Sequence, residues 1–471
     1  MINLKKYDLY LNGQWVKSKG DDWIEVENPA TKEIFAYVPA STEEDVNIAV
    51  EGANKALKTW RTTDINERIA IVEKMIDYFI EHKEEIINTV IEELGSTIKI
   101  TEAIHYEQYI INAKDFVEQA RKMPMVDHYD GYDVYRDAVG VVACLTPWNF
   151  PFGQIEKKVI PALLMGNTII LKPSQKAPIT GYYFAQASHE AGLPAGVLQL
   201  VTGRGGEVGN VLAKHEDVHM LSFTGSTKGG KEVAYLGLDT MKRLALELGG
   251  KSAAIILEGA DYDQAVKDAL FGVFPNAGQA CSSKTRLLAP RKDKALIEEL
   301  AIKHAKDYKF GDPRDPENDY GAIVSEQAYH KVMSYIELGK KEATLLYEGD
   351  YSNTKGYFIP PVIFTDVDNK SRIAQEEIFG PVLCIIYYDT VEEAIDLAND
   401  SIYGLHGQIA GPQDKCLEVA EQIQAGQIII NNGTRTQNAP FGGYKQSGIG
   451  REGGIYGLEE YVELKTLFVS K

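Results

Sequence analysis

A cysteine at position 281 lies where an inert thiol would not normally be placed. In FPNAGQACSSK, residues 274–284, it is surrounded by small or polar residues that leave the sulfur accessible and bring backbone N–H groups close to it. Cys144 in VVACL and Cys384 in PVLCII lie instead inside apolar runs, which is typical of structural cysteines. The residue types therefore nominate Cys281 as a nucleophile, although this stretch alone fits a loop cysteine without chemical function equally well.

A thiol that attacks a carbonyl carbon also needs a base and donors for the developing oxyanion. Glu247 in LELGGKS is a candidate base, because its glycine neighbours would let a substrate or a water molecule approach. Asn149, flanked by two prolines in PWNFP, offers a rigidly held amide, and an ordinary turn asparagine is the alternative. With glycines that suit a dinucleotide, these residues indicate oxidation of an aldehyde through a thioester. A free thiol titrates near pH 8.5, roughly, so the site must favour the thiolate at neutral pH.

The segment after Gly140 has to position these side chains. Short β-rich runs alternate there with helical segments, which is typical of a parallel sheet with crossover helices. Such sheets bind ligands at the carboxyl ends of their strands. Polar or glycine residues stand at all five expected strand ends: Pro147-Trp148-Asn149, Lys172, Gly203, Gly225-Ser226 and Glu247.

The flanking regions have their own patterns. Asn12-Gly13 predicts a hairpin, and a second extended pair is expected around Asn28-Pro29. Ser41-x-x-Glu44 predicts a capping box for a helix that runs to about Trp60. The next helix opens at Asp64 and continues towards Gly95, and another occupies roughly residues 97–121. Past Gly250 a second α/β region begins, in which SAAIILE, KTRLLAP, PVLCIIYY and QIIINN are the expected strands.

Residues 124–137, PMVDHYDGYDVYRD, predict two Tyr-rich strands that turn at Asp130-Gly131. Their polarity suggests an excursion from the core that pairs with something else, such as another subunit. The last strand, YVELKTLFV, has the alternation of an edge or exchanged strand.

Composition excludes several classes of function. A chain of 471 residues exceeds the size at which single cores stop growing, about 250–300 residues, so at least two domains are expected. A formal net charge of −19 disfavours nucleic acid and anionic lipid as partners. Four cysteines make no disulfide framework, and we expect neither a leader peptide nor a membrane span. The sequence therefore predicts a cytoplasmic enzyme.

Three other motifs carry less weight. His215-Glu216-Asp217-Val218-His219 matches H-E-x-x-H, but the strand MLSFTG begins directly afterwards, so a helix with both histidines on one face lacks room and no metal is expected. Gly225 to Lys231 resembles a P-loop, but Glu232 stands where a hydroxyl must bind magnesium. Gly203-x-Gly205-x-x-x-Gly209 is longer than the common dinucleotide fingerprint.

From about residue 5 to the C-terminus, the chain resembles the aldehyde dehydrogenase superfamily of the hydrolytic type. The resemblance is carried by seven ordered motifs: PWNFP, LKPS, FTGST, LELGGKS, FPNAGQAC, EEIFGPV and PFGGYKQSG. It implies an α/β fold with a Rossmann-like dinucleotide-binding domain (1–123 and 139–249), an α/β catalytic domain (250–445) and a β oligomerisation arm (124–138 and 446–471). It also implies a homodimer or homotetramer.

The same resemblance implies roles for individual residues. Cys281 would be the nucleophile, Glu247 the general base, and Asn149 with the Cys281 N–H the oxyanion hole. The cofactor would be NAD, with NADP possible because Gln175, with Lys176 beside it, stands where many NAD-preferring relatives have a glutamate that repels a 2′-phosphate. Residues expected to contact the cofactor are Trp148, Lys172, Gln175, Gly205, Gly225, Ser226, Glu377 and Phe379.

Two alternatives remain open at this point. A coenzyme-A-acylating relative would release the thioester to a thiol, and the presence of Glu247 argues against it. A non-catalytic binding protein on the same fold is the second alternative, and the intact set of Cys281, Glu247 and Asn149 argues against that.

The substrate funnel is expected near Phe152, Gln154, Lys157, Arg435 and Phe441. In one hypothesis the long side chains of Lys157 and Arg435 point to solvent or pair with acidic neighbours such as Glu156. In the other, one or both bind a carboxylate or another polar group on the aldehyde.

Overall fold

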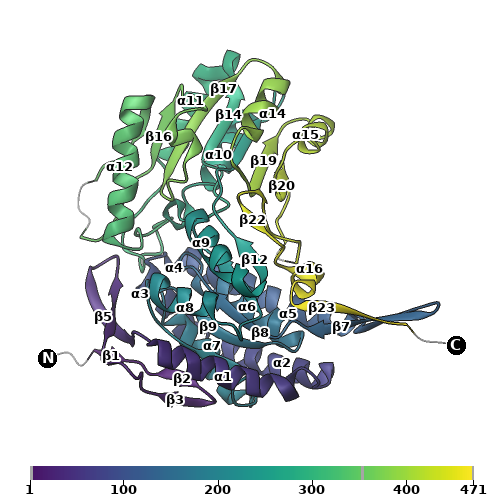
Figure 1. The fold of residues 1–471 in the computed structure, drawn as a ribbon. Coiled ribbons are helices and arrows are strands. Elements are labelled where there is room, and N and C mark those ends of the chain that lie inside the picture. The colour runs from purple at the N-terminus through teal and green to yellow at the C-terminus, as the bar shows by residue number, and fades with distance from the viewer. Residues whose placement is uncertain (1–3, 352–354, 437, 469–471) are drawn as a thin grey trace.

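The computed structural model describes residues 4–351, 355–436 and 438–468 and arranges them as two α/β regions with a projecting arm (Figure 1). The N-terminal strands and α1 to α8 lie in the lower region of the view, and α10 to α15 lie in the upper one. Within these ranges, no helix combines the length and the apolar character that crossing a bilayer requires.

An eight-stranded sheet forms the first region, in the order β22-β12-β11-β8-β9-β10-β2-β3. The five strands from β12 to β10 run parallel, and β8 and β9 are buried along their whole length, which explains their continuous apolar sequences. The strands predicted after Gly140 are thus confirmed. The bounds are β2 Leu9–Leu11, β3 Gln14–Val16, β8 Val141–Leu145, β9 Thr168–Lys172, β10 Leu198–Leu200, β11 Met220–Thr224, β12 Arg243–Glu247 and β22 Gly448–Ile449.

Alternating side chains of β8 point to two different cores. Val141 and Ala143 pack with apolar residues of α1 and α8, whereas Val142 and Cys144 pack with residues of α2, α5 and α6. The sheet is therefore covered on both faces, as the strand–helix rhythm predicts. The helices around it are α1 Glu43–Trp60, α2 Ile65–Glu81, α3 Lys83–Leu94, α5 Gln108–Lys122, α6 Pro151–Leu164, α7 Thr180–Glu190, α8 Asn210–Lys214 and α9 Thr227–Gly237.

The start of α1 differs from the prediction by one residue. Thr42, not Ser41, is the N-cap, and it forms a capping box with Asp45. The Asp45 carboxylate also accepts hydrogen bonds from the Ser18 hydroxyl, at 2.6 Å, and from the Lys19 N–H, at 3.0 Å. This contact with a distant loop stabilises the Thr42 register over the Ser41 register.

The helix predicted over residues 97–121 is interrupted. A short helical turn, α4 (Ile98–Ile100), leads into a π-helical segment, Thr101–Glu107, before α5 begins at Gln108. The helix predicted from Asp64 towards Gly95 is likewise divided, between α2 and α3 at His82. Periodicity alone carries no information on such local changes in helical hydrogen bonding.

A seven-stranded sheet forms the second region, in the order β15-β16-β17-β14-β13-β19-β20. All of its pairs are parallel except β15 with β16. The four expected strands are confirmed. The bounds are β13 Ala253–Ile256, β14 Arg286–Pro290, β15 Thr344–Glu348, β16 Val362–Thr365, β17 Val382–Tyr388, β19 His406–Ala410 and β20 Gln427–Ile430, and the main helices are α10 Tyr262–Phe271, α11 Lys294–Ala305, α12 Glu326–Glu342, α14 Val391–Asn399 and α15 Gln413–Ala420.

Three smaller sheets complete the described part of the chain, and one of them pairs β18 (Tyr403–Gly404) with β21 (Tyr444–Lys445). β4 (Trp23–Asn28) and β5 (Glu33–Pro39) form the second predicted extended pair, with β1 (Lys5–Lys6) beside β5. β6 (Val126–Tyr129), β7 (Tyr132–Ala138) and the last strand β23 (Val462–Phe468) form the arm, which extends to the right in Figure 1. The Tyr-rich strands therefore pair with the C-terminal strand of their own chain.

Not all of residues 446–471 lie in this arm. β22 pairs with β12 in the first sheet, and α16 (Gly454–Glu459) packs against α5. We propose a domain division in which 1–123 and 139–249 form the first domain, 250–445 form the second, and the C-terminal part of the arm is β23 alone.

Candidate active site

The loop that carries Cys281 has an unusual backbone. Asn276 and Ala277 both adopt left-handed conformations, each with φ of 54°, although neither is glycine. Gly278 follows with φ of 72°, and a Cβ atom there would lie 2.1 Å from the carbonyl oxygen of Gly380. Left-handed residues with side chains persist only where surrounding contacts hold them. The position of the sulfur is therefore fixed by the packing around the loop.

The Gln279 side chain holds the loop through hydrogen bonds. Its Nε2 donates to the carbonyl oxygens of Asn276 and Ala322, both at 3.1 Å, and its Oε1 accepts from the Val324 N–H at 2.9 Å. Asn149 Nδ2 donates to the Gln279 carbonyl oxygen at 3.0 Å, and Asn276 Nδ2 donates to the Asn149 carbonyl oxygen at 2.9 Å. The buried Asn149 amide and the cysteine loop are thus held as one unit.

Glu247 lies at the carboxyl end of β12 and is 3% exposed. Its Oε2 has no hydrogen-bond partner among the described residues. Burial, with the Glu452 carboxylate as the next contribution, raises the pKa of Glu247 well above its usual value, and the ammonium groups of Lys158 and Lys157 oppose this rise. An unpartnered carboxylate with a raised pKa is suited to accept a proton near neutral pH.

The Cys281 sulfur does not behave as the sequence suggested. Burial, and then the carboxylates of Glu377 and Glu247, raise the pKa of the thiol to about 12, while Arg435 and Lys157 lower it. In the ligand-free protein these groups therefore act against the thiolate that the sequence analysis expects the site to favour.

Two adjoining cavities lie at the carboxyl ends of the parallel strands in the first sheet. One is lined by Trp148, Gly225, Ser226, Glu377, Phe379 and Cys281 among others. The other is lined by Lys172, Gln175 and Gly205 among others. Because Trp148 and Lys176 line both, the two cavities form one cleft. All eight residues predicted to contact the cofactor are brought together along it.

Polar groups along this cleft are placed to receive a ligand. Ser226 caps α9, and the Glu377 carboxylate accepts from the Gly250 N–H at 3.1 Å. Lys172 donates to the Pro173 carbonyl oxygen at 3.0 Å, and burial lowers the pKa of its ammonium to about 8. The Trp148 and Phe379 rings meet edge to face at 5.4 Å.

A further cavity is also lined by Cys281. Its lining includes Gln154, Lys157, Arg435 and Phe441, as the sequence predicts for the substrate funnel. Phe152 is the exception. Its ring is fully buried in an aromatic cluster with Phe79, Tyr106 and Phe184, on the side of α6 that faces the core. The assignment of Phe152 to the funnel is therefore corrected.

The sequence model of the aldehyde dehydrogenase family matches residues 15–467. The chain belongs to the aldehyde dehydrogenase family. A putative aldehyde dehydrogenase of Staphylococcus aureus (strain MSSA476) is 39% identical over 468 residues, which cover 97% of this chain and 98% of the relative. A Mycobacterium tuberculosis aldehyde dehydrogenase, solved with NAD+, is 38% identical with a TM-score of 0.97 and 99% coverage of both chains. Aldehyde dehydrogenase C of Pseudomonas syringae, solved as a mutant with NAD+ and octanal, is 39% identical with a TM-score of 0.95, and the match covers 98% of this chain and 96% of that one.

In this aldehyde dehydrogenase, the sequence analysis missed two charged residues that affect the pKa of Glu247, namely Lys158 and Glu452. Lys158, on α6, is fully buried, and its Nζ contacts Glu452 Oε1 at 2.6 Å and Ser222 Oγ at 3.2 Å. Adjacent lysines in the strongly apolar α6 were the available signal for Lys158. Nothing in the glycine-rich segment around Glu452 distinguishes a buried carboxylate from an exposed one.

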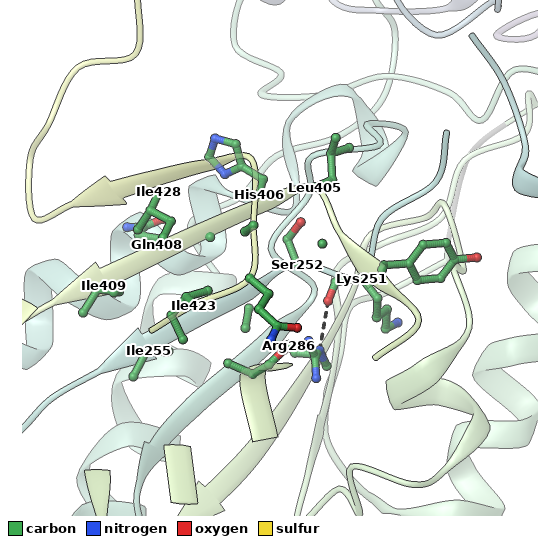
Figure 2. Close-up of a pocket in the computed structure, with 17 residues that line it drawn as sticks. Lys251, Ser252, Ile255, Arg286, Leu405, His406, Gln408, Ile409, Ile423 and Ile428 are labelled. Atoms are coloured by element: carbon green, nitrogen blue, oxygen red, sulfur yellow. Dashed lines mark hydrogen bonds between the residues drawn. The ribbon is translucent and has the colours of Figure 1, made fainter. Parts of the chain in front are cut away.

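A small cavity elsewhere in the second domain is structural (Figure 2). Arg286 lies there beside β13, and its Nε donates to the Lys251 carbonyl oxygen at 2.9 Å. Its guanidinium also donates to the carbonyl oxygens of Leu397 and Ala398, both at 2.8 Å. Lys251 directly follows the glycines after Glu247, so this aldehyde dehydrogenase uses Arg286 to anchor the segment that leaves the active site.

Proposed function

We propose that the chain oxidises an aldehyde to a carboxylic acid through covalent intermediates on Cys281. The observation that carries the proposal is the place of this cysteine. Of the described residues, only Cys281 lines both the long cleft at the strand ends and the cavity that contains Lys157 and Arg435. A nucleophile between two ligand cavities can hold a substrate carbon against a cofactor that occupies the first.

We propose NAD as that cofactor. The Mycobacterium tuberculosis and Pseudomonas syringae structures, both similar to this chain, were solved with NAD+. The residues present suit a dinucleotide: a buried lysine ammonium with protons to donate, a capped helix N-terminus for the phosphates, and the Glu377 carboxylate next to Cys281. Gln175 lines the same cleft without a charge that would repel a 2′-phosphate, which leaves NADP possible.

The proposed steps use the chain's own groups as follows. The Cys281 sulfur bonds to the aldehyde carbon while the S–H proton leaves to water in the cavity, and Asn149 Nδ2 with the Cys281 N–H donates to the resulting oxyanion. Bound NAD supplies the hydride acceptor. Glu247 then takes a proton from a water molecule whose oxygen bonds to the thioester carbon. The carbon–sulfur bond breaks to release the acid, and the proton held by Glu247 returns to the sulfur through water.

The buried, unpartnered Glu247 carboxylate supports hydrolysis over transfer of the acyl group to coenzyme A. A dependence of product formation on added coenzyme A would reverse this assignment.

We further propose a cytoplasmic homodimer or homotetramer. Its four cysteines are free thiols, as in a reducing compartment. β23 exposes Leu464, Leu467 and Phe468 on the arm, by 66%, 41% and 83%. Large exposed apolar side chains on a projecting sheet are typical of a subunit interface.

An absorbance screen of the purified protein tests the function directly. We expect reduction of NAD+ with at least one member of a panel of aldehydes, and none with the Cys281→Ala variant. Turnover by folded Cys281→Ala would contradict the covalent mechanism, and a lack of reduction with every aldehyde and both cofactors would contradict the function.

A further inference from the structure

The cavity on the substrate side of Cys281 has an unusual charge. Lys157, Lys284 and Arg435 line it, whereas no aspartate or glutamate does so among the described lining residues. The chain as a whole carries 68 acidic and 49 basic residues. A cavity lined by three cations and no carboxylate in so acidic a protein is a local departure from the average that an anionic ligand would explain.

Two of the cations share one aromatic neighbour. The Lys157 ammonium lies 4.6 Å from the centroid of the Phe441 ring, and the Arg435 guanidinium lies 4.8 Å from it. The Lys157 ammonium is also 5.8 Å from the Tyr109 ring. These rings hold both cations beside the cavity without neutralising them.

Lys157 is 2% exposed, which excludes the hypothesis that it points to solvent. The alternative pairing with Glu156 is not made either, because Asn112 Nδ2 donates to both oxygens of Glu156, at 2.8 and 3.1 Å. Burial, and then Arg435, lower the pKa of Lys157, and the carboxylates of Glu452, Glu156 and Glu247 oppose this only in part. The lysine is therefore held in a position that disfavours its own charge.

Lys284 and Arg435 complete the group. Burial, and then Arg435, lower the pKa of Lys284 to about 8, and Arg435 Nε is buried without a hydrogen-bond partner in the described chain. None of the three cations that line this cavity forms a salt bridge with any residue that the structure describes. Lys157 is buried and Lys284 and Arg435 are half-buried. A buried cation without a salt bridge is rare because its desolvation is uncompensated, so Lys157 with two further cations on the same cavity indicates a missing anion.

We propose that the substrate of this site is an aldehyde that carries an anionic group, and that Lys157, Lys284 and Arg435 bind this group while the carbonyl carbon lies at Cys281. This inference rests on the proposed function and specifies the substrate class. A carboxylate and a phosphate share the required chemistry: both accept several charge-assisted hydrogen bonds, and Arg435 suits either as a bidentate donor.

Turnover measurements separate the possible substrates. We expect kcat/KM for glutaric semialdehyde to exceed that for pentanal, its uncharged counterpart of equal length, by about tenfold to a hundredfold, the range for one or two charge-assisted contacts. Glyceraldehyde 3-phosphate tests a phosphate in place of the carboxylate. A preference for pentanal over both anionic aldehydes would overturn the inference and leave the proposed function intact.

Variants then test which groups discriminate. Arg435→Gln and Lys157→Met should each reduce the ratio of kcat/KM for the anionic over the neutral aldehyde by about tenfold or more. Arg435→Lys should retain part of the ratio because it keeps the charge. Lys303→Gln, which removes an exposed lysine paired with Asp263, is the control for loss of one positive charge and should leave the ratio unchanged.

Thermal stability distinguishes binding from a structural role. Because Lys157 is buried and unpaired, Lys157→Met should fold with an unchanged or higher Tm while it loses discrimination. A lower Tm with full discrimination would show that Lys157 only supports the fold, and would contradict its role here.

Binding provides a test that does not depend on catalysis. We expect the Cys281→Ala variant to bind glutaric semialdehyde or glyceraldehyde 3-phosphate at least tenfold more tightly than pentanal in calorimetry, and Arg435→Gln in the same background to abolish the difference. Equal affinity for the three aldehydes would refute the inference even if the natural protein oxidised no aldehyde at all.

Discussion

Replacing Glu247 by glutamine should separate the two halves of the proposed reaction. Glutamine preserves the shape of a side chain that is 3% exposed but cannot accept a proton from water. Loss of a general base typically reduces a rate by about 10² to 10⁴, which corresponds to about 2.7–5.4 kcal/mol in the barrier to hydrolysis. Formation of the thioester should survive, because removing the Glu247 charge also removes one of the groups that raise the pKa of the Cys281 thiol.

Stopped-flow absorbance is the assay. The Glu247→Gln variant should give a burst of reduced cofactor that approaches one equivalent per active site, followed by slow turnover. Glu258→Gln, at an exposed glutamate paired with Lys292, is the matched control and should behave as the unmodified protein does. Loss of the burst together with turnover would show that Glu247 activates the thiol, and normal turnover would show that another base activates the water.

The stability of the same variant provides an independent check. The raised pKa means that folded Glu247 retains a proton that the unfolded chain loses near its usual pKa of about 4.3. Folding stability from this group is therefore full at low pH and falls as the pH rises through the interval up to the folded pKa. Since glutamine does not titrate, the Tm of Glu247→Gln should gain on that of the unmodified protein as the pH rises through this interval. A constant difference in Tm would contradict the raised pKa.

Four further predictions concern other parts of the molecule. Alanine at Cys144, Cys384 or Cys416 should leave the chemistry intact, because these three sulfurs are buried away from the cavities. Loss of activity in a folded variant at any of the three positions would contradict this. Gln175 should allow NADP, so a preference for NAD in kcat/KM above roughly a thousandfold, about 4 kcal/mol, would mean that another group excludes the 2′-phosphate. KM for an anionic aldehyde, but not for a neutral one, should rise above about pH 8 as Lys284, which faces Arg435, Asp268 and His406, loses its proton; parallel profiles would refute this. Leu464→Asp on β23 should shift the oligomer towards monomers in light scattering, and an unchanged mass would exclude this face of the arm from the interface.

The sheets and the main cleft could be predicted because their signals are local. Continuous apolar runs such as those of β8 and β9 identify buried parallel strands, and residues at strand ends must meet at one edge of a sheet. Choices that depend on distant contacts could not be predicted. Ser41 and Thr42 both offer a capping box, and only the loop at Ser18 and Lys19, which binds Asp45, selects between them.

The burial of the charged residues in the site, and their effects on one another, could not be predicted from the sequence. The sequence suggests that a long cation such as Lys157 reaches solvent, since nothing local shows that every residue of α6 is buried. It also names Cys281, Glu247 and Glu377 one by one, but it does not show that these two carboxylates lie close enough to raise the pKa of the thiol. Burial and long-range charge are properties of the assembled fold.

The paired left-handed residues before Cys281 set a limit on how this protein can be improved. Each such conformation costs a residue with a side chain about 1–2 kcal/mol relative to glycine. Glycine at Ala277 would remove that cost in the folded state. Laboratory selection for heat resistance alone could therefore favour a substitution only four residues before the nucleophile. The same substitution would let the loop backbone adopt more conformations, and the Cys281 sulfur could then occupy more positions. We therefore expect substitutions in this loop that raise thermostability to lower turnover, so a selection experiment must select for both properties together.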